Sequence, residues 1–167
     1  MNPSLEYEIL NCGGESVPLD DESVDFIYSF EVLEHVQDPY KVLSEIYRLL
    51  KKGGKAYIST CNYDSFYEGH YKRFWNPLIA PEGNKRNFVK KGLSPHFFDE
   101  LNFITKKKIV EYVNDIGFSK CEFDPILQNP INNVHLEVIM ADETKSLIPK
   151  KENKADNAIG GGSNSLA

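Results

Sequence analysis

The sequence predicts an α/β fold built around a parallel β-sheet. An apolar segment, residues 24–30, is followed by a helical pattern after Asp38 and then by a second apolar segment, residues 56–60. A strand, a helix and a strand in this order form a βαβ unit, whose parallel strands are joined by a right-handed crossover in nearly all proteins. The chain has 167 residues, 41% of them hydrophobic, which suffices for one globular domain with a buried core.

The strand predictions rest on short apolar runs. Residues 7–11 predict a first strand, which leads into a loop that contains Gly13 and Gly14. Residues 24–30 are apolar with little alternation, so we expect a strand covered on both faces. Residues 56–60 predict the next strand of the sheet.

The helix between these two strands has a clear predicted start and end. Asp38 is a favourable N-cap, and Pro39 is tolerated at the first helical position because its missing N–H needs no partner there. We expect Gly53 and Gly54 to end the helix in a left-handed conformation. The predicted buried face consists of Val42, Leu43, Ile46, Leu49 and Leu50.

The second half of the chain predicts one more helix and two strands. Thr105 is a suitable N-cap for a helix over residues 105–116, and Gly117 is a suitable stop. Residues 118–123 and 135–140 predict the last two strands, a hairpin with a long connection. From residue 143 to residue 167 the sequence is rich in polar residues and glycine, so we expect a disordered polar tail.

Charge and cysteine content exclude several classes of function. The net charge of −6 argues against a nucleic-acid partner, which requires a basic surface. Cys12, Cys61 and Cys121 are odd in number and show no Cys/His ligand spacing, so we expect no metal site and a reducing, cytoplasmic location. No apolar run reaches the roughly 18 residues needed for a transmembrane segment, and no signal peptide is visible.

Three motifs together resemble one enzyme family. They are V-P-L-D-D-E-S-V-D-F at residues 17–26, E-V-L-E-H-V at 31–36 and R-L-L-K-K-G-G at 48–54. In this order and spacing they resemble the class I S-adenosylmethionine-dependent methyltransferases of the small-molecule group, which includes quinone-biosynthesis methylases. The resemblance covers about residues 5–142 and implies a Rossmann-like, doubly wound sheet with an antiparallel carboxy-terminal strand.

The resemblance also implies that residues 1–142 form only part of a methyltransferase domain. Relatives begin with a strand and an E/D-x-G-x-G-x-G loop, then a second strand that ends in a ribose-binding acid, and neither is found here. The family's sheet order is 3-2-1-4-5-7-6, so without the first two strands residues 24–30 would form an apolar edge. Truncation, a split enzyme completed by a partner chain, and a degenerate protein with another role are the three explanations.

The resemblance implies S-adenosyl-L-methionine as the cofactor, bound at the carboxyl ends of the strands. The Asp that contacts adenine in relatives aligns with Gly13. We therefore expect the adenine contacts to fall on the backbone of Gly14 and the side chain of Glu15. The positions that resemble those lining the methionine moiety and the methyl group are Ser29, Phe30 and Glu31; for the first two, ordinary packing at a strand end explains the residues equally well.

Residues 61–104 resemble the family's acceptor lid and contain half of the chain's aromatic residues. Aromatic side chains mixed with a histidine and cations suit a planar or amphipathic acceptor with an anionic group. A small aromatic core beneath a long loop is an equally good interpretation. The candidate substrate contacts are Tyr67, Tyr71, Arg73 and Trp75, with a weaker basic rim of Lys85, Arg86, Lys90 and Lys91.

Methyl transfer to an oxygen or carbon acceptor also requires removal of a proton. His70 is the first candidate for this base and His35 the second, with Glu34 beside it at the mouth of the site; packing against the following helix is the alternative role of His35. The expected function is therefore methyl transfer to a small-molecule acceptor: a sugar, a quinone-like ring or a lipid intermediate. The alternative is a non-catalytic interaction module, or a split-enzyme subunit, that uses the exposed sheet edge.

Overall fold

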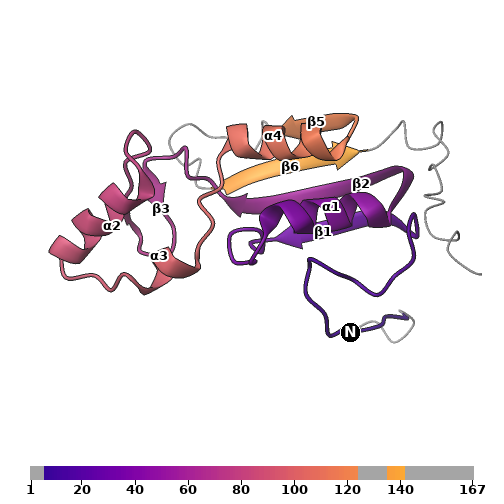
Figure 1. Cartoon of the computed structure of the whole chain (residues 1–167), viewed down its shortest axis with the longest axis horizontal. Coiled ribbons are helices and arrows are strands. Elements are labelled where there is room, and N and C mark those ends of the chain that lie inside the picture. The colour runs from indigo at the N-terminus through magenta and orange to yellow at the C-terminus, as the bar shows by residue number, and fades with distance from the viewer. Residues whose placement is uncertain (1–5, 124–134, 142–167) are drawn as a thin grey trace, which may run out of the picture.

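The computed structural model describes residues 6–123 and 135–141, and its centre is a four-stranded sheet (Figure 1). The strands are β1 (Val24–Phe30), β2 (Leu50–Cys61), β6 (His135–Ala141) and β5 (Lys120–Phe123), in this spatial order. β1 and β2 are parallel, and β6 is antiparallel to both of its neighbours. This arrangement confirms the βαβ unit and reproduces the second half, 4-5-7-6, of the sheet order that the resemblance implies. The predicted tail, residues 143–167, and the connection between β5 and β6 lie outside the described residues.

Two helices form where the capping residues predict them. α1 (Pro39–Leu49) begins at Asp38, whose carboxylate accepts a hydrogen bond from the backbone N–H of Lys41 at 3.2 Å. α4 (Lys106–Ile116) begins at Thr105 and ends at Gly117, which has a φ of 104°. Both predicted helix starts and the predicted end of α4 are confirmed, because local side-chain and glycine chemistry is enough to set them.

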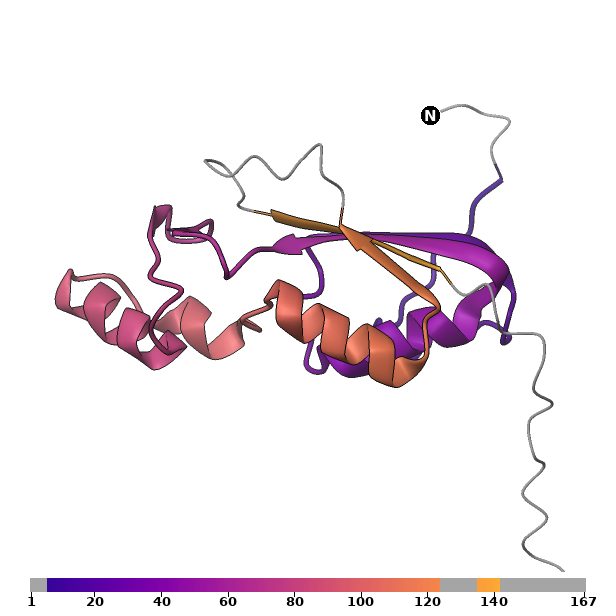
Figure 2. The same ribbon diagram turned by 90° about the horizontal axis from the view of Figure 1, so that it is seen from above.

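Both helices pack on the same face of the sheet (Figure 2). The core between them is apolar and closely packed, with Leu43, Ile58, Ile109, Val138 and Met140 each no more than 1% exposed. The opposite face of β1 is different. There Phe26, Tyr28 and Phe30 are 59%, 59% and 56% exposed.

The prediction that β1 is covered on both faces is therefore wrong for the described part of the chain. The ring of Tyr28 stacks on those of Phe30 and Tyr57, at centroid distances of 6.3 and 5.6 Å, so the exposed aromatic side chains form a continuous surface. β1 also lies at the edge of the described sheet, as expected. The apolar residues of β1 favour burial, but the sequence does not indicate which segment would pack on the exposed face.

Residues 7–11 do not form the predicted strand. Tyr7 and Ile9 are 66% and 83% exposed. The described sheet offers this segment no neighbouring strand. An extended segment without a partner gains no ladder hydrogen bonds, so its apolar composition alone does not make it a strand.

The glycine pair after α1 has a different role from the one predicted. The helix ends at Leu49, and Leu50 is already extended, with φ −66° and ψ 130°. Gly53, with φ 73°, lies within β2, where the pairing with β1 shifts register between Val24 and Phe26. A Cβ on Gly54 would lie 3.2 Å from the carbonyl oxygen of Asp25, so glycine permits the close approach of the two strands.

Residues 61–104 form a lobe beside the sheet (Figure 1). It contains β3 (Tyr67–Glu68), β4 (Arg73–Phe74), α2 (Pro81–Lys90) and α3 (His96–Glu100). Its side chains build a second core from Cys61, Tyr63, Trp75, Phe88 and Phe98. No helix in the described part of the chain is long and apolar enough to cross a membrane.

Candidate active site

The candidate site begins where β1 and β2 end side by side. Glu31, the first residue after β1, has a φ of 52°, and its backbone N–H donates to the carbonyl oxygen of Ser59 at 2.9 Å. A positive φ is unfavourable for a residue with a side chain, and such strain concentrates at functional sites. The turn directs the chain across the carboxyl end of β2.

The last residues of β2 hold two carboxylates in place. The Ser59 hydroxyl donates to Oε1 of Glu31 at 2.9 Å, and the Thr60 hydroxyl donates to Oε2 of Glu34 at 2.7 Å. Sγ of Cys61 lies 3.5 Å from Oε2 of Glu31. Two acidic groups and a thiol therefore share one end of the sheet.

Glu34 is fully buried, although the sequence places it at the mouth of the site. Its Oε1 has no hydrogen-bond partner among the described residues. Burial raises the pKa of Glu34, and the neighbouring carboxylate of Glu31 raises it further. Burial, followed by the charges of Glu34 and Glu31, also raises the pKa of the Cys61 thiol.

The two predicted histidines come together although they are 35 residues apart. Nε2 of His70 lies 3.3 Å from Nε2 of His35, and the rings meet edge to face at 5.1 Å. Nδ1 of His70 lies 2.7 Å from Oε1 of Glu68. Glu68 is 2% exposed, and its Oε2 accepts a hydrogen bond from the backbone N–H of Tyr71 at 2.6 Å. A buried carboxylate therefore fixes one side of the His70 ring and leaves the other side toward His35.

The cluster also contains residues that could hold a metal ion. One ligand atom from each of Glu34, Cys61 and His70 lies within 4.8 Å of the other two. These residues belong to three separate segments, so their spacing in the sequence gives no signal of a metal site. Cys61 is a site residue that sequence reasoning missed for this reason, and Glu68, two residues before His70, was also missed.

The positions expected to bind the cofactor lie on two segments. Oε1 of Glu15 accepts a hydrogen bond from the backbone N–H of Gln37 at 3.1 Å, which holds the Gly14 turn beside the loop that follows β1. Ser29 is half-buried in β1, and Phe30 is exposed. In residues 6–123 no glycine-rich loop joins a strand to a helix, so the cradle for the methionine end is not among the described residues.

The candidate substrate contacts divide into exposed and buried residues. Tyr67 on β3 and Arg73 on β4 are exposed. Tyr71 is half-buried, and its hydroxyl donates to the carbonyl oxygen of Ser94 at 2.6 Å. Trp75 is only 2% exposed, so it belongs to the aromatic core of the lobe, the alternative that the sequence left open.

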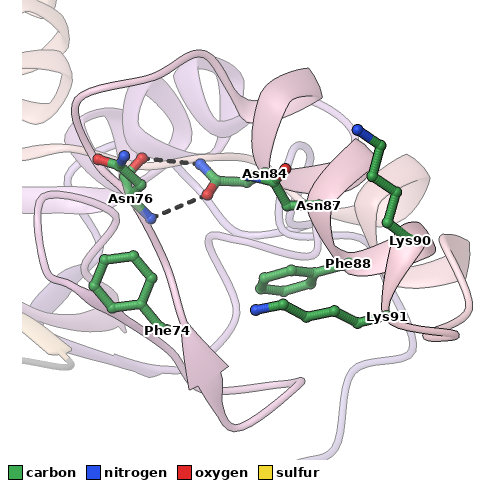
Figure 3. Close-up of a pocket in the computed structure, with 7 residues that line it drawn as sticks. All are labelled: Phe74, Asn76, Asn84, Asn87, Phe88, Lys90 and Lys91. Carbon is green, nitrogen blue, oxygen red and sulfur yellow. Dashed lines mark hydrogen bonds between the residues drawn. The ribbon is translucent and has the colours of Figure 1, made fainter.

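A cavity of about 330 Å³ lies within the lobe (Figure 3). The backbone N–H of Asn76 donates to Oδ1 of Asn84 at 3.0 Å, and Nδ2 of Asn84 donates back to the Asn76 carbonyl at 2.9 Å. This pair connects β4 to α2. The cavity is lined by Phe74, Asn76, Asn84, Asn87, Phe88, Lys90 and Lys91, so two of the four predicted basic-rim residues face it.

Comparisons with known proteins agree with this geometry. Residues 2–58 match the family described as a methyltransferase domain. An uncharacterized protein of Methanocaldococcus jannaschii is 27% identical over 76% of this chain and 54% of its own length. A ubiquinone biosynthesis O-methyltransferase of Cupriavidus pinatubonensis is 24% identical over 68% of this chain and 41% of its own. The chain thus spans about half the length of the curated relatives it matches.

One solved structure shows that the fold is shared. A S-adenosylmethionine-dependent methyltransferase of Thermotoga maritima, described as a possible histamine N-methyltransferase, superimposes with a TM-score of 0.53 at 20% identity, covering 78% of this chain and 62% of its own. The sheet and its polar carboxyl edge therefore define a Rossmann-like protein of the class I methyltransferase type. Together, the matching domain family over residues 2–58, the relatives and the shared fold support a class I S-adenosylmethionine-dependent methyltransferase.

Proposed function

We propose that this chain supplies the acceptor side and part of the cofactor side of an enzyme that methylates a small molecule. The observation that carries the proposal is the polar cluster at the carboxyl ends of β1 and β2, where open α/β sheets bind their ligands. The sulfonium of S-adenosylmethionine supplies an already activated methyl group. The protein must then hold the acceptor in line and remove its proton.

On the cofactor side, the Gly14 backbone and the Glu15 side chain are proposed to contact adenine. Ser29, Phe30 and Glu31 are proposed to line the methionine moiety and the methyl group. Support comes from the bond between Glu15 and the Gln37 N–H, because it holds the adenine side against the loop that leaves β1. The strained turn at Glu31 points to the same edge.

On the acceptor side, His70 is the proposed base. With Nδ1 donating its hydrogen bond to Glu68, the Nε2 lone pair is left to take the acceptor's proton. His35, 3.3 Å away, is the second candidate and can receive the proton from His70. Glu68 therefore orients the His70 ring before any acceptor is bound.

The lobe of residues 61–104 is proposed as the acceptor lid. Tyr67 and Arg73 are exposed, and they would provide aromatic and cationic contacts, with Tyr71 between them and Trp75 supporting them from within. The acceptor is then a sugar, a quinone-like ring or a lipid intermediate. The quinone-like ring is favoured because the Cupriavidus relative is a ubiquinone biosynthesis O-methyltransferase. A cytoplasmic location, in keeping with three free cysteines among those described, is part of the same proposal.

Calorimetry with S-adenosylhomocysteine tests the cofactor side on the 167-residue chain. We expect Glu31→Ala to weaken binding about 10-fold, as the loss of one charge-assisted contact does. Glu22→Ala is the matched control, because Glu22 is an exposed glutamate that also has a positive φ, 55°. An absence of binding by the unmodified chain, or equal weakening in both variants, would contradict the assignment.

The second candidate function is that of an interaction module or split-enzyme subunit. It is favoured by the exposed aromatic surface of Phe26, Tyr28 and Phe30 on the edge strand β1. An apolar edge of this kind recruits further strands or covering segments. Analytical ultracentrifugation of the unmodified chain and of Tyr28→Lys tests this idea. If the surface is used for association, the unmodified chain should self-associate with rising concentration, or bind a co-expressed polypeptide that carries the family's glycine-rich loop and first two strands. The Tyr28→Lys variant should lose this association. An unmodified chain that stays monomeric and binds no such polypeptide would contradict the idea.

A further inference from the structure

We propose that Glu34, Cys61 and His70 form a binding site for a divalent metal ion, and that Zn²⁺ fits the ligands best. The set combines a carboxylate oxygen, a thiolate sulfur and an imidazole nitrogen. These are the three ligand types that Zn²⁺ accepts in proteins, whereas Mg²⁺ and Ca²⁺ prefer oxygen alone. The inference goes beyond methyl transfer and does not depend on it.

The distances suit a tetrahedral ion after small movements. Zn²⁺ bonds of about 2.0–2.3 Å separate neighbouring ligand atoms by roughly 3.4–3.6 Å. The three ligand atoms lie within 4.8 Å of one another, so side-chain shifts of about 1 Å would bring them to the separations found around Zn²⁺. Nε2 of His35 lies 3.3 Å from Nε2 of His70, but His35 is not one of the three residues whose ligand atoms group within 4.8 Å.

Electrostatics and burial also point to a cation. Glu34 is 0% exposed and its Oε1 lacks a donor among the described residues, so the carboxylate that lies with the thiol and imidazole has one buried oxygen without compensation. The carboxylate of Glu31 faces the same cluster and contacts Cys61 at 3.5 Å. A divalent ion would satisfy the Oε1 lone pair and offset two of the three negative charges of Glu31, Glu34 and the Cys61 thiolate.

The surroundings of His70 match those of a metal ligand. Metal-binding histidines usually donate their second ring N–H to a carboxylate, which fixes the ring. Glu68 provides this partner at 2.7 Å and is itself held by the Tyr71 N–H and, at 3.3 Å, by the hydroxyl of Tyr63. A metal on Nε2 would occupy the nitrogen proposed as the base, so the metal-loaded and base-competent forms exclude each other.

Titration of the full chain with Co²⁺ tests the site, because Co²⁺ replaces Zn²⁺ and reports its ligands by absorption. We expect one Co²⁺ per chain, a near-ultraviolet band from thiolate-to-metal charge transfer, and displacement of the ion by Zn²⁺. Cys61→Ser should remove the band. His70→Gln should weaken binding by more than about 100-fold, and Glu68→Gln by about 10- to 100-fold with the band retained, as changes outside the ligand shell do.

Cys121→Ser is the matched control, because Cys121 is a half-buried thiol that is not one of the cluster's ligands. It should keep both the band and the affinity, and far-ultraviolet circular dichroism of every variant confirms that the fold is intact. No band in the folded unmodified chain, or a band that survives Cys61→Ser, would overturn the proposal. Since the readout is metal binding, it is separate from the S-adenosylhomocysteine titration that tests the proposed function.

Discussion

Replacement of Trp75 by phenylalanine tests whether this residue supports the lid from within. The indole is 2% exposed, stacks on Phe103 at a centroid distance of 5.4 Å, and donates from Nε1 to the Tyr63 carbonyl at 3.1 Å. The variant leaves that carbonyl without its donor, which costs about 1–3 kcal/mol. The smaller ring also removes three heavy atoms from the core, worth roughly 1 kcal/mol or more. We therefore expect the free energy of unfolding to fall by about 2–4 kcal/mol.

Urea unfolding followed by far-ultraviolet circular dichroism measures this change, since Trp75 is the chain's single tryptophan and its fluorescence is lost in the variant. Phe74→Ala is the control, because the neighbouring Phe74 is 62% exposed and its removal should alter stability by less than about 0.5 kcal/mol. A Trp75→Phe variant as stable as the parent chain would refute the burial argument. Trp75 would then again be a candidate for direct contact with the acceptor.

Two further predictions concern the βαβ unit. Asp38→Ala should lower the free energy of unfolding by about 0.5–2 kcal/mol in urea titrations, because the cap on Lys41 N–H is lost, whereas Asp38→Asn should keep most of it. The Arg48 guanidinium lowers the pKa of Glu45 below its ordinary 4.5, so the stability that this carboxylate provides is complete above that value and is lost as pH falls through the lower folded pKa. Urea unfolding midpoints measured between roughly pH 3 and 7 should show a smaller loss of stability toward low pH for Glu45→Gln than for the parent chain. The same pH dependence in both proteins would disprove the role of the Glu45–Arg48 pair.

The predictable parts of the fold are those set by local chemistry. Asp38 and Thr105 start their helices through bonds to a backbone N–H three residues ahead, and Gly117 ends α4, so each signal lies within a few residues of its effect. The misassigned parts depend on distant neighbours. Residues 7–11 have strand composition but no pairing strand in the described sheet. A Cβ on Gly54 would meet the Asp25 carbonyl oxygen at the edge of β1 at 3.2 Å, in addition to the Lys51 carbonyl oxygen of its own strand at 2.9 Å, and no local pattern reveals the approach of β1.

The candidate site shows the same division. The motif around Glu31 and His35 marks the end of β1, and the resemblance placed His70 near the acceptor. The grouping of Glu34 with Cys61 and His70 could not be predicted, because these residues lie 27 and 9 positions apart along the chain. Burial of Glu34 likewise follows from packing of the lobe against the sheet and not from its neighbours in the chain.

By itself, the sequence determined the βαβ unit, the capped helices and the family, because periodicity, caps and motif spacing are properties of short stretches of chain. Only the tertiary structure decided which face of β1 is covered, that Trp75 is core, and that a carboxylate, a thiol and an imidazole meet at one point. These outcomes depend on contacts between segments tens of residues apart, and such contacts exist only once the sheet has brought the carboxyl ends of its strands together.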